Sequence, residues 1–383
     1  MKSQLPLTSI VGTARVVDRK LLTNRIVASD GTVSEGTGLT TIDLNYPAND
    51  PKRSQLMQLL EVRQIGAVMH SSPLLLSNEG KMSYNATTQK IESSNREDYV
   101  LFGSTQGLLH VVKAPDYAET LTDGVVTNNG GGKEVFAFVP HEMIEKQNQA
   151  FLNSEQTTGG TANLFYGIDA PWTAYTEYVP KSDGTLTVGT GKSITVDGST
   201  TSLQGKQLVY GGLRMGGRSY YALDLQDMTS PKLKFHINPD AATTGPLSHM
   251  GQSWSKPKIT WVNWGGQRKL VMFVGGGYDS GYESDTYNQT NGKGAGVYMF
   301  DALSGELLWW ASNNATATTQ ATTTSGVIAL KDPNLKYSVV SDIKTVDRNN
   351  DGLVDHLYFG DLSGQVFRID LNTQIQIPSA THL

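Results

Sequence analysis

The sequence of 383 residues contains no cysteine. This absence excludes disulfide bridges, thiolate metal sites such as zinc ribbons, and thiol nucleophiles. Charged residues are also few, at 17%, and the net charge of −5 includes no run of lysine or arginine. Neither nucleic acid nor an anionic membrane surface is expected as a partner, because both are bound through clusters of basic residues.

Long apolar stretches are missing as well. No run of 18 apolar residues occurs, and the first residues, MKSQLPLTSIVG, lack the continuous apolar segment of a signal peptide. The sequence therefore predicts no direct insertion into a membrane. The chain is expected to be either cytosolic or a segment of a longer exported protein whose signal lies upstream.

The residues that are abundant favour β-structure. Forty glycines and 16 tyrosines, with many threonines and serines, are typical of short strands and turns. A loose module of strand, glycine-rich turn, strand and acidic residue recurs from about residue 65, and each copy predicts a β-hairpin. Four copies are visible: DYVLFGSTQGLLHVVKAPD (98–116), QLVYGGLRMGGRSYYALDLQD (207–227), LVMFVGGGYDS to GAGVYMFDALSG (270–305) and DHLYFGDLSGQVFRIDLNT (355–373).

These hairpins predict an all-β fold. A lone hairpin is marginally stable in water, and radially packed four-stranded sheets bury its faces, so a modified β-propeller is the leading architecture. A β-sandwich and a β-helix are the alternatives. Residues 1–60 are expected to be an irregular lead-in, with helix-like spacing over 51–66, and residues 61–383 the propeller domain. Long loop insertions are expected at 122–133, 181–206 and 312–326.

An acidic loop within VDRNNDGLVDHLYFGDLSGQVFRIDL (346–371) predicts a calcium site. Oxygen side chains stand at positions 1, 3, 5 and 9 of the loop and Gly352 at position 6, as in EF-hand-type loops. Position 12 is Tyr358 instead of Glu, and strands flank the loop, so it is a compact variant. The predicted Ca²⁺ ligands are the side chains of Asp347, Asn349, Asp351 and Asp355 and the carbonyl of Leu353. An acidic turn that binds no ion is the alternative interpretation.

A second acidic loop spans residues 275–294 and contains Asp279, Glu283 and Asp285. Their spacing matches no ligand template, which favours a solvated loop over a second metal site.

No hydrolytic motif is present. The sequence has no Gly-x-Ser-x-Gly, His-Glu-x-x-His or phosphate-binding loop, and His70 is expected to be a structural residue. The segment GVYMFDALSGELLWW (296–310) resembles the tryptophan-docking repeats of quinoprotein dehydrogenases, but it is the one good copy. Trp309 and Trp310 are expected to be packing residues. The chain is thus predicted not to be an enzyme, with a pyrroloquinoline-quinone dehydrogenase and a purely structural surface scaffold as alternatives.

Eight segments resemble, in order, the C-terminal domain of the PilC/PilY family of type IV pilus tip-associated proteins, over about residues 60–373. They are QIGAVMHSSPLLL (64–76), DYVLFGSTQGLLHVVKA (98–114), VFAFVPHEMI (135–144), YGIDAPWTAYTEYV (166–179), QLVYGGLRMGGRSYYALDL (207–225), SWSKPKI (253–259), VMFVGGGYDSG (271–281) and DIKTVDRNNDGLVDHLYFGDLSGQVFRIDL (342–371).

The resemblance implies a quinoprotein-like propeller with one calcium loop, at the predicted residues. It also implies a place at the pilus tip or outer membrane surface of a Gram-negative bacterium, with minor pilins of the tip complex as partners. Pilus biogenesis, opposition to retraction in twitching motility, and adhesion to surfaces or a host-cell receptor, with a role in virulence, are the implied functions.

Two departures from the family pattern stand out. The family's N-terminal region and signal peptide are absent, and the chain stops soon after the calcium loop, so either it is a fragment or its propeller closes unusually. The tripeptide at 359–361 is Phe-Gly-Asp and lacks the arginine of an integrin-binding Arg-Gly-Asp. Integrin recognition through that tripeptide is not expected.

Overall fold

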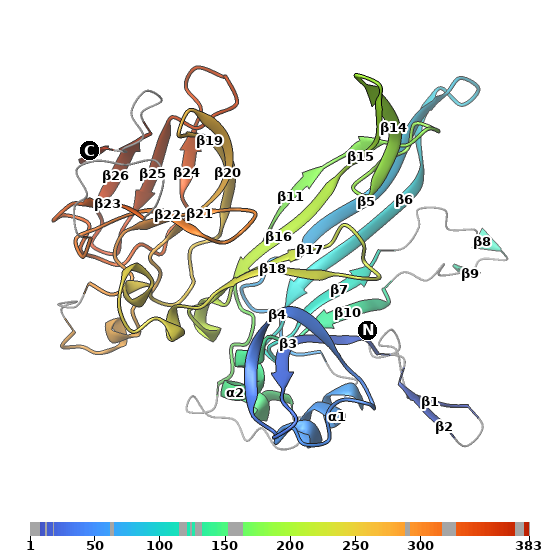
Figure 1. Ribbon diagram of the computed structural model, residues 1–383, viewed down its shortest axis with the longest axis horizontal. Coiled ribbons are helices and arrows are strands. Elements are labelled where there is room, and N and C mark those ends of the chain that lie inside the picture. Colours follow the sequence, from blue (N-terminus) through green and yellow to red (C-terminus); the bar gives the residue numbers. More distant parts are fainter. Residues whose placement is uncertain are drawn as a thin grey trace. The chain divides into compact units, whose positions relative to one another are not determined.

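The computed structural model describes most of the chain (Figure 1). The described residues are 8–11, 14–17, 19–61, 65–114, 121–122, 125–126, 132–151, 164–287, 292–315, 327–371 and 379–382. Strands dominate, and no helix in these ranges is long and apolar enough to span a membrane. The helices are α1 (Arg53–Glu61), α2 (His141–Gln147) and short 3₁₀ turns at Asn148–Phe151, Arg214–Gly216, Pro239–Ala241, Pro246–His249 and Ser280–Glu283.

The largest sheet has eight strands. In spatial order they are β12 (Val179–Pro180), β13 (Leu186–Thr187), β5 (Leu74–Asn85), β6 (Lys90–Gly103), β7 (Leu109–Lys113), β10 (Glu134–Phe138), β3 (Leu21–Val27) and β4 (Val33–Ile42). β10 and β3 pair in parallel, whereas β5, β6 and β7 pair antiparallel. The N-terminal strands thereby extend a sheet that is otherwise built from later parts of the chain.

Three further sheets have four or five strands each. Their strands, in spatial order, are β11 (Thr173–Glu177), β16 (Lys206–Gly212), β17 (Tyr220–Asp224) and β18 (Lys232–Ile237); β19 (Lys258–Trp264), β20 (Gln267–Gly275), β21 (Val297–Asp301), β22 (Leu307–Ser312) and β23 (Ile328–Lys331); and β24 (Lys344–Val346), β25 (His356–Gly360), β26 (Val366–Asp370) and β27 (Ser379–His382). Small hairpins are formed by β1 (Thr8–Val11) with β2 (Ala14–Val17), β8 (Leu121–Thr122) with β9 (Val125–Val126), and β14 (Thr190–Val196) with β15 (Ser199–Gln204).

The all-β prediction is confirmed. Each of the four recurring modules forms a pair of neighbouring strands, namely β6–β7, β16–β17, β20–β21 and β25–β26. Two of their turn glycines have the positive φ that the prediction requires, +82° at Gly107 and +86° at Gly364. Successive small sheets whose neighbouring strands follow one another in the sequence are the blade-type units expected of a modified β-propeller.

The predicted helix and insertions have mixed outcomes. α1 lies within the stretch 51–66 and buries Leu56, Leu59 and Leu60. The insertion 181–206 is not simply a loop, because it contains β13 and the β14–β15 hairpin. The insertions 122–133 and 312–326 lie mostly outside the described residues.

The chain divides into two compact units, each described here by itself. One comprises residues 1–168, 174–209 and 223–233, and the other residues 169–173, 210–222 and 234–383. The domain boundary at residue 60 stays a prediction. Within residues 1–60, Leu21–Val27 and Val33–Ile42 form strands β3 and β4 of the largest sheet.

In the second unit, the β19–β23 and β24–β27 sheets contribute to one apolar core. Trp309 is 0% exposed within it, and Trp310 is 4% exposed and stacks on Tyr298 at a ring separation of 5.5 Å. Both tryptophans are therefore packing residues. The other buried members include Val262, Val271, Phe273, Val297, Met299, Leu335, Val339, Leu357, Phe359, Phe367 and Ile369.

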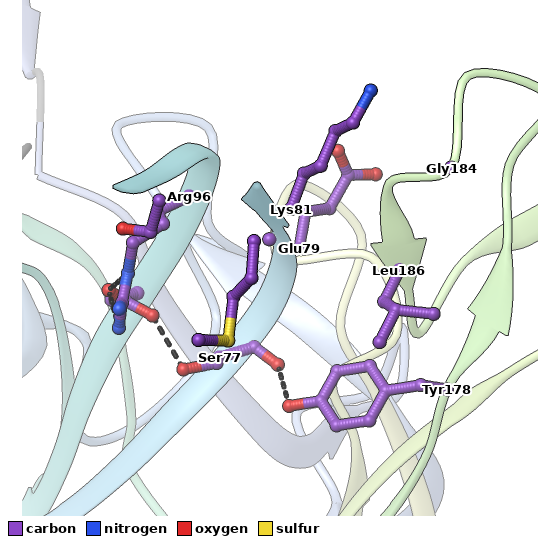
Figure 2. A pocket seen from close by; sticks show the side chains of 11 residues that line it. Ser77, Glu79, Lys81, Arg96, Tyr178, Gly184 and Leu186 are labelled. Carbon is purple, nitrogen blue, oxygen red and sulfur yellow. Dashed lines mark hydrogen bonds and ion pairs between the residues drawn. The ribbon is translucent and has the colours of Figure 1, made fainter. Parts of the chain in front are cut away.

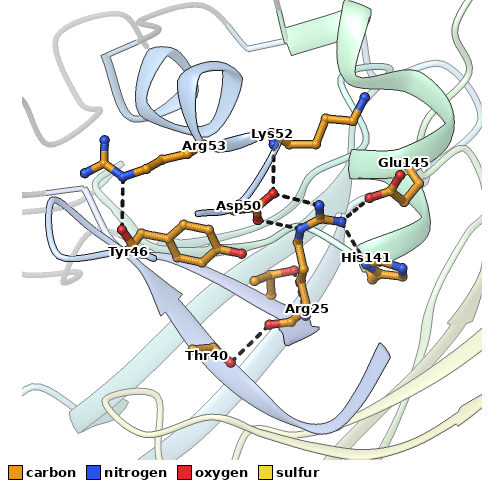
Figure 3. A network of polar contacts seen from close by, with 9 residues as sticks. Arg25, Thr40, Tyr46, Asp50, Lys52, Arg53, His141 and Glu145 are labelled. Atoms are coloured by element: carbon orange, nitrogen blue, oxygen red, sulfur yellow. Dashed lines mark hydrogen bonds and ion pairs between the residues drawn. The ribbon is translucent and has the colours of Figure 1, made fainter. Parts of the chain in front are cut away.

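In the first unit, a buried arginine ties β3 to the chain around both helices (Figure 3). The Arg25 guanidinium donates to both carboxylate oxygens of Asp50, at 2.7 and 2.8 Å, and pairs with Glu145 on α2. Burial alone would lower the pKa of Arg25, but the hydrogen bonds and charges of these two partners raise it above its ordinary value. Removing one partner from such a pair leaves an uncompensated buried charge.

Candidate functional site

The predicted calcium loop connects two strands of the last sheet. It begins after β24 and ends at β25, which pair antiparallel with Val346 opposite His356. The N–H of Asp355 donates to the Val346 carbonyl at 2.9 Å, and the N–H of Val354 donates to the carbonyl of Trp261 on β19 at 2.9 Å. Both ends of the loop are thus held by backbone hydrogen bonds, one of them from a strand distant in the sequence.

Inside the loop, the chain folds around Asp347. Its two carboxylate oxygens accept the N–H groups of Asn350 and Gly352, at 2.6 and 2.8 Å. Asn350 and Gly352 have positive φ values of 62° and 82°, and at Gly352 this explains why the sharp turn falls on a glycine. The loop therefore has a defined internal geometry.

The remaining oxygen side chains are also engaged by the loop backbone. The Asp351 carboxylate accepts the N–H of Leu353 at 2.8 Å, and the Asp355 carboxylate accepts the N–H of Arg348 at 2.7 Å. The Asn349 amide donates to Asp351 at 3.0 Å. All of the predicted side-chain ligands thus make hydrogen bonds within this loop.

The loop supplies the chemistry that Ca²⁺ requires, namely several carboxylate, amide and carbonyl oxygens on a short turn. However, no group of three or more Asp, Glu or His side chains in the described ranges converges closely enough to hold a metal ion. Binding would require the carboxylates to turn toward a common centre. Calcium binding by Asp347, Asn349, Asp351, Leu353 and Asp355 stays a prediction.

The second acidic loop is partly structural. Asp279 is 6% exposed, accepts the N–H of Gly281 at 2.9 Å at the start of a 3₁₀ turn, and binds the Tyr287 hydroxyl. Glu283 and Asp285 are exposed, as expected of a solvated loop. The capping role of Asp279 could not be predicted, because Tyr287 lies in a stretch without strand or helix periodicity.

A buried trio in the first unit has the order of a hydrolytic triad. His110 lies 3.0 Å from the Ser104 hydroxyl through Nε2 and 2.7 Å from Glu134 through Nδ1. Glu134 also accepts a hydrogen bond from Arg19 at 2.7 Å. Ser104, His110 and Glu134 are 1%, 0% and 5% exposed, so a substrate has no access to the serine in this conformation. The arrangement is a hydrogen-bonded core network.

A surface pocket of about 430 Å³ lies beside the long β5–β6 hairpin (Figure 2). Its polar groups bind one another: the Tyr178 hydroxyl donates to the Ser77 carbonyl at 2.7 Å, and Arg96 pairs with Asp98 at 2.6 Å. Met82 and Leu186 provide apolar lining. The pocket therefore combines apolar contacts with polar side chains that are already hydrogen-bonded or ion-paired.

Two smaller predictions concern His70 and the tripeptide 359–361. His70 is exposed, and its structural role stays a prediction. In the tripeptide 359–361, Phe359 is buried and the Asp361 carboxylate accepts the N–H groups of Ser363 and Gln365, both at 3.0 Å. Asp361 thus stabilises the turn between β25 and β26.

Sequence comparison finds relatives with a common description, although no family model matches the chain. The chain is 27% identical over 308 residues to the type IV pilus biogenesis factor PilY1 of Pseudomonas aeruginosa strains PAO1 and PAK. It is 24% identical over 292 residues to the PilY1 homolog of Xylella fastidiosa strain Temecula1. The first match covers 80% of the chain and 21% of the relative, so the chain spans about a fifth of that protein's length.

Structural comparison finds the C-terminal domain of P. aeruginosa PilY1, with 24% identity and a TM-score of 0.41 over 75% of this chain and 40% of that one. It also finds BamB from Moraxella catarrhalis, with 9% identity and a TM-score of 0.29 over 94% of this chain and 75% of that one. The sequence match to PilY1 covers most of the chain. The chain is homologous to one part of the type IV pilus biogenesis factor PilY1.

Proposed function

We propose that the chain is the propeller-type part of a type IV pilus biogenesis factor that works at the bacterial surface. The observation that carries this proposal is the sequence homology to PilY1 over 308 residues. Pilus proteins are assembled outside the cytoplasm, so the full-length protein is exported and associated with the pilus, at its tip or at the outer membrane. The working partners are minor pilins of the tip complex, and adhesion to a surface or host receptor is a further role of the same exposed protein.

The role is not enzymatic in this proposal. The relatives are described as pilus biogenesis factors, and the one triad-like set of side chains identified above is buried. A propeller fold is shared by enzymes and binding proteins, so function has to follow from a site and not from the fold.

The site in this proposal is the loop 347–355, which binds one Ca²⁺. When bound, Ca²⁺ supplies positive charge that offsets the −3 carried by Asp347, Asp351 and Asp355. Asp347 would hold the ion from the start of the loop and Asp355 from its end, next to the backbone hydrogen bond with Val346. A bound Ca²⁺ ion would therefore link the two ends of the loop to its central turn.

A calcium-dependent rearrangement of this loop gives a way to regulate a pilus contact. Ligand binding stabilises the bound form by about 1.4 kcal/mol for each tenfold excess over Kd, enough to shift a local equilibrium without unfolding the sheet. We infer that the calcium-bound loop favours the state that supports pili and opposes their retraction.

The test is made in cells that produce the full-length protein. Asp355→Ala is expected to leave protein level and export unchanged while surface piliation and twitching motility fall. The matched control is Asp342→Ala, which removes an exposed aspartate just before the loop and is expected to behave as wild type. If Asp355→Ala loses calcium binding but keeps wild-type piliation and motility, the site has only a structural role.

A further inference from the structure

A cationic side chain lies against the outside of the calcium loop. Arg268 is an exposed residue near the start of β20, next to the turn Gly265–Gly266 of the β19–β20 hairpin. A Cβ atom built on Gly352 would lie 3.6 Å from Nη2 of Arg268. Since Gly352 has no side chain, this distance places the guanidinium group close to the turn at position 6 of the loop.

The same guanidinium group contacts Trp261 on the partner strand of the hairpin. Its Cζ atom lies 4.8 Å from the centre of the Trp261 ring. The backbone carbonyl of Trp261 in turn accepts the N–H of Val354, at 2.9 Å. Trp261 thus binds the loop through a backbone hydrogen bond, and the Arg268 guanidinium that packs on its ring brings a positive charge close to the loop's turn.

The loop and the Arg268 guanidinium carry opposite charges. The loop carries three carboxylates, whose mutual repulsion is strongest when no cation is bound. The guanidinium stays protonated at any physiological pH, so its charge is permanent. A fixed positive charge at this position lowers the repulsion in the empty loop and also repels an incoming Ca²⁺.

We propose that Arg268 is an internal counter-ion of the calcium loop, which weakens Ca²⁺ binding and relays occupancy of the loop to Trp261 and the β19–β20 hairpin. The inference rests on the proposed calcium site. When the ion binds, the guanidinium is repelled and its packing on the indole changes. The two events are linked because the same group lies close to the Gly352 turn and packs on the Trp261 ring.

The size of the effect follows from Coulomb's law. In water, the repulsion between the guanidinium and a Ca²⁺ ion about 8 Å away raises the Kd for Ca²⁺ roughly fivefold. The interaction is between exposed groups, so most of it is screened when salt shortens the Debye length to a few ångströms. Removing the charge should therefore tighten calcium binding at low ionic strength and change it little in about 1 M salt.

The test is calcium titration by calorimetry on the purified chain, with wild type, Arg268→Gln and Arg268→Lys. Arg268→Gln is expected to bind Ca²⁺ about fivefold more tightly at low salt. Arg268→Lys keeps the charge and is expected to stay near wild type. Lys192→Gln, which removes an exposed charge from β14 in the other unit, controls for net charge. Circular dichroism checks that each variant is folded.

Tryptophan fluorescence provides the second readout. Calcium is expected to change the emission of the wild type, and this change should disappear in Trp261→Phe and shrink in Arg268→Gln. Wild-type binding with unchanged or weaker affinity in Arg268→Gln would overturn the counter-ion role alone. Failure of the wild type to bind Ca²⁺ would overturn the proposed site and this inference together.

Discussion

Replacing Arg25 with methionine is expected to destabilise the first unit by about 3–5 kcal/mol, the usual cost of breaking a buried ion pair from one side. The side chains of Arg25 and Asp50 are both 0% exposed, and two hydrogen bonds of 2.7 and 2.8 Å join them (Figure 3). In the variant, Asp50 keeps the backbone N–H of Lys52 at 2.7 Å but loses its buried cation.

Removing both charges should cost much less than removing one. Two buried partners replaced together by apolar side chains of similar size are often neutral, because no unpaired group remains. The double variant Arg25→Met with Asp50→Leu is therefore expected to recover most of the stability lost in Arg25→Met. In the double variant Glu145 also loses its ion pair with Arg25, but its side chain is 41% exposed, so water can hydrate its charge.

The assay is urea unfolding followed by circular dichroism, with wild type, both single variants and the double variant. A coupling free energy of several kcal/mol between positions 25 and 50 is expected from this cycle. A loss below about 1 kcal/mol in Arg25→Met, the range of an exposed pair, would refute the reasoning that this ion pair is buried and structurally important.

Two further predictions concern the core network and the enzymatic alternative. Burial lowers the pKa of His110 below 6.5 in the folded chain. As pH drops below about 6.5, the unfolded chain therefore protonates His110 before the folded chain does, and the free energy of unfolding should fall. His110→Gln should reduce that slope by up to about 1.4 kcal/mol per pH unit, measured by urea unfolding from pH 7 to 5; an unchanged slope would contradict the assignment. With added pyrroloquinoline quinone and Ca²⁺, the chain should oxidise no alcohol or sugar above a heat-inactivated control, and turnover would overturn the non-enzymatic role.

The hairpins could be predicted because their signals are local. A glycine such as Gly364, between two strands of alternating side chains, predicts a turn without any knowledge of distant residues. The acidic spacing in residues 347–355 is equally local, which explains why the fold of this loop around Asp347 and Gly352 agrees with the expected turn.

Some features of the fold could not be predicted because they depend on segments that are distant in the sequence. The parallel pairing of β10 with β3 joins segments on either side of the whole β5–β7 region. The β14–β15 hairpin differs, because its signal is local and the loop prediction overlooks it. In β14, Ile194 and Val196 alternate with polar residues, and Asp197-Gly198 forms the tight turn with φ values of 50° and 78°.

The buried ionic networks were also beyond sequence reasoning. Arg19 and Glu134 meet from segments 115 residues apart, and a charged residue is usually assigned to the surface. The proximity of Arg268 to the loop 347–355 has the same origin, since β20 and the loop approach only in the folded unit.

The most direct test of the calcium-loop proposal is calorimetric titration of the purified chain with Ca²⁺, in wild type and Asp351→Ala. A single site is expected, with a Kd in the micromolar range or weaker, because one exposed loop with three carboxylates resembles calcium sensors and extracellular modules. Asp351→Ala should abolish binding, whereas Asp342→Ala, outside the loop, should leave it unchanged. Equal affinity in wild type and Asp351→Ala would contradict the proposal and place any calcium site elsewhere.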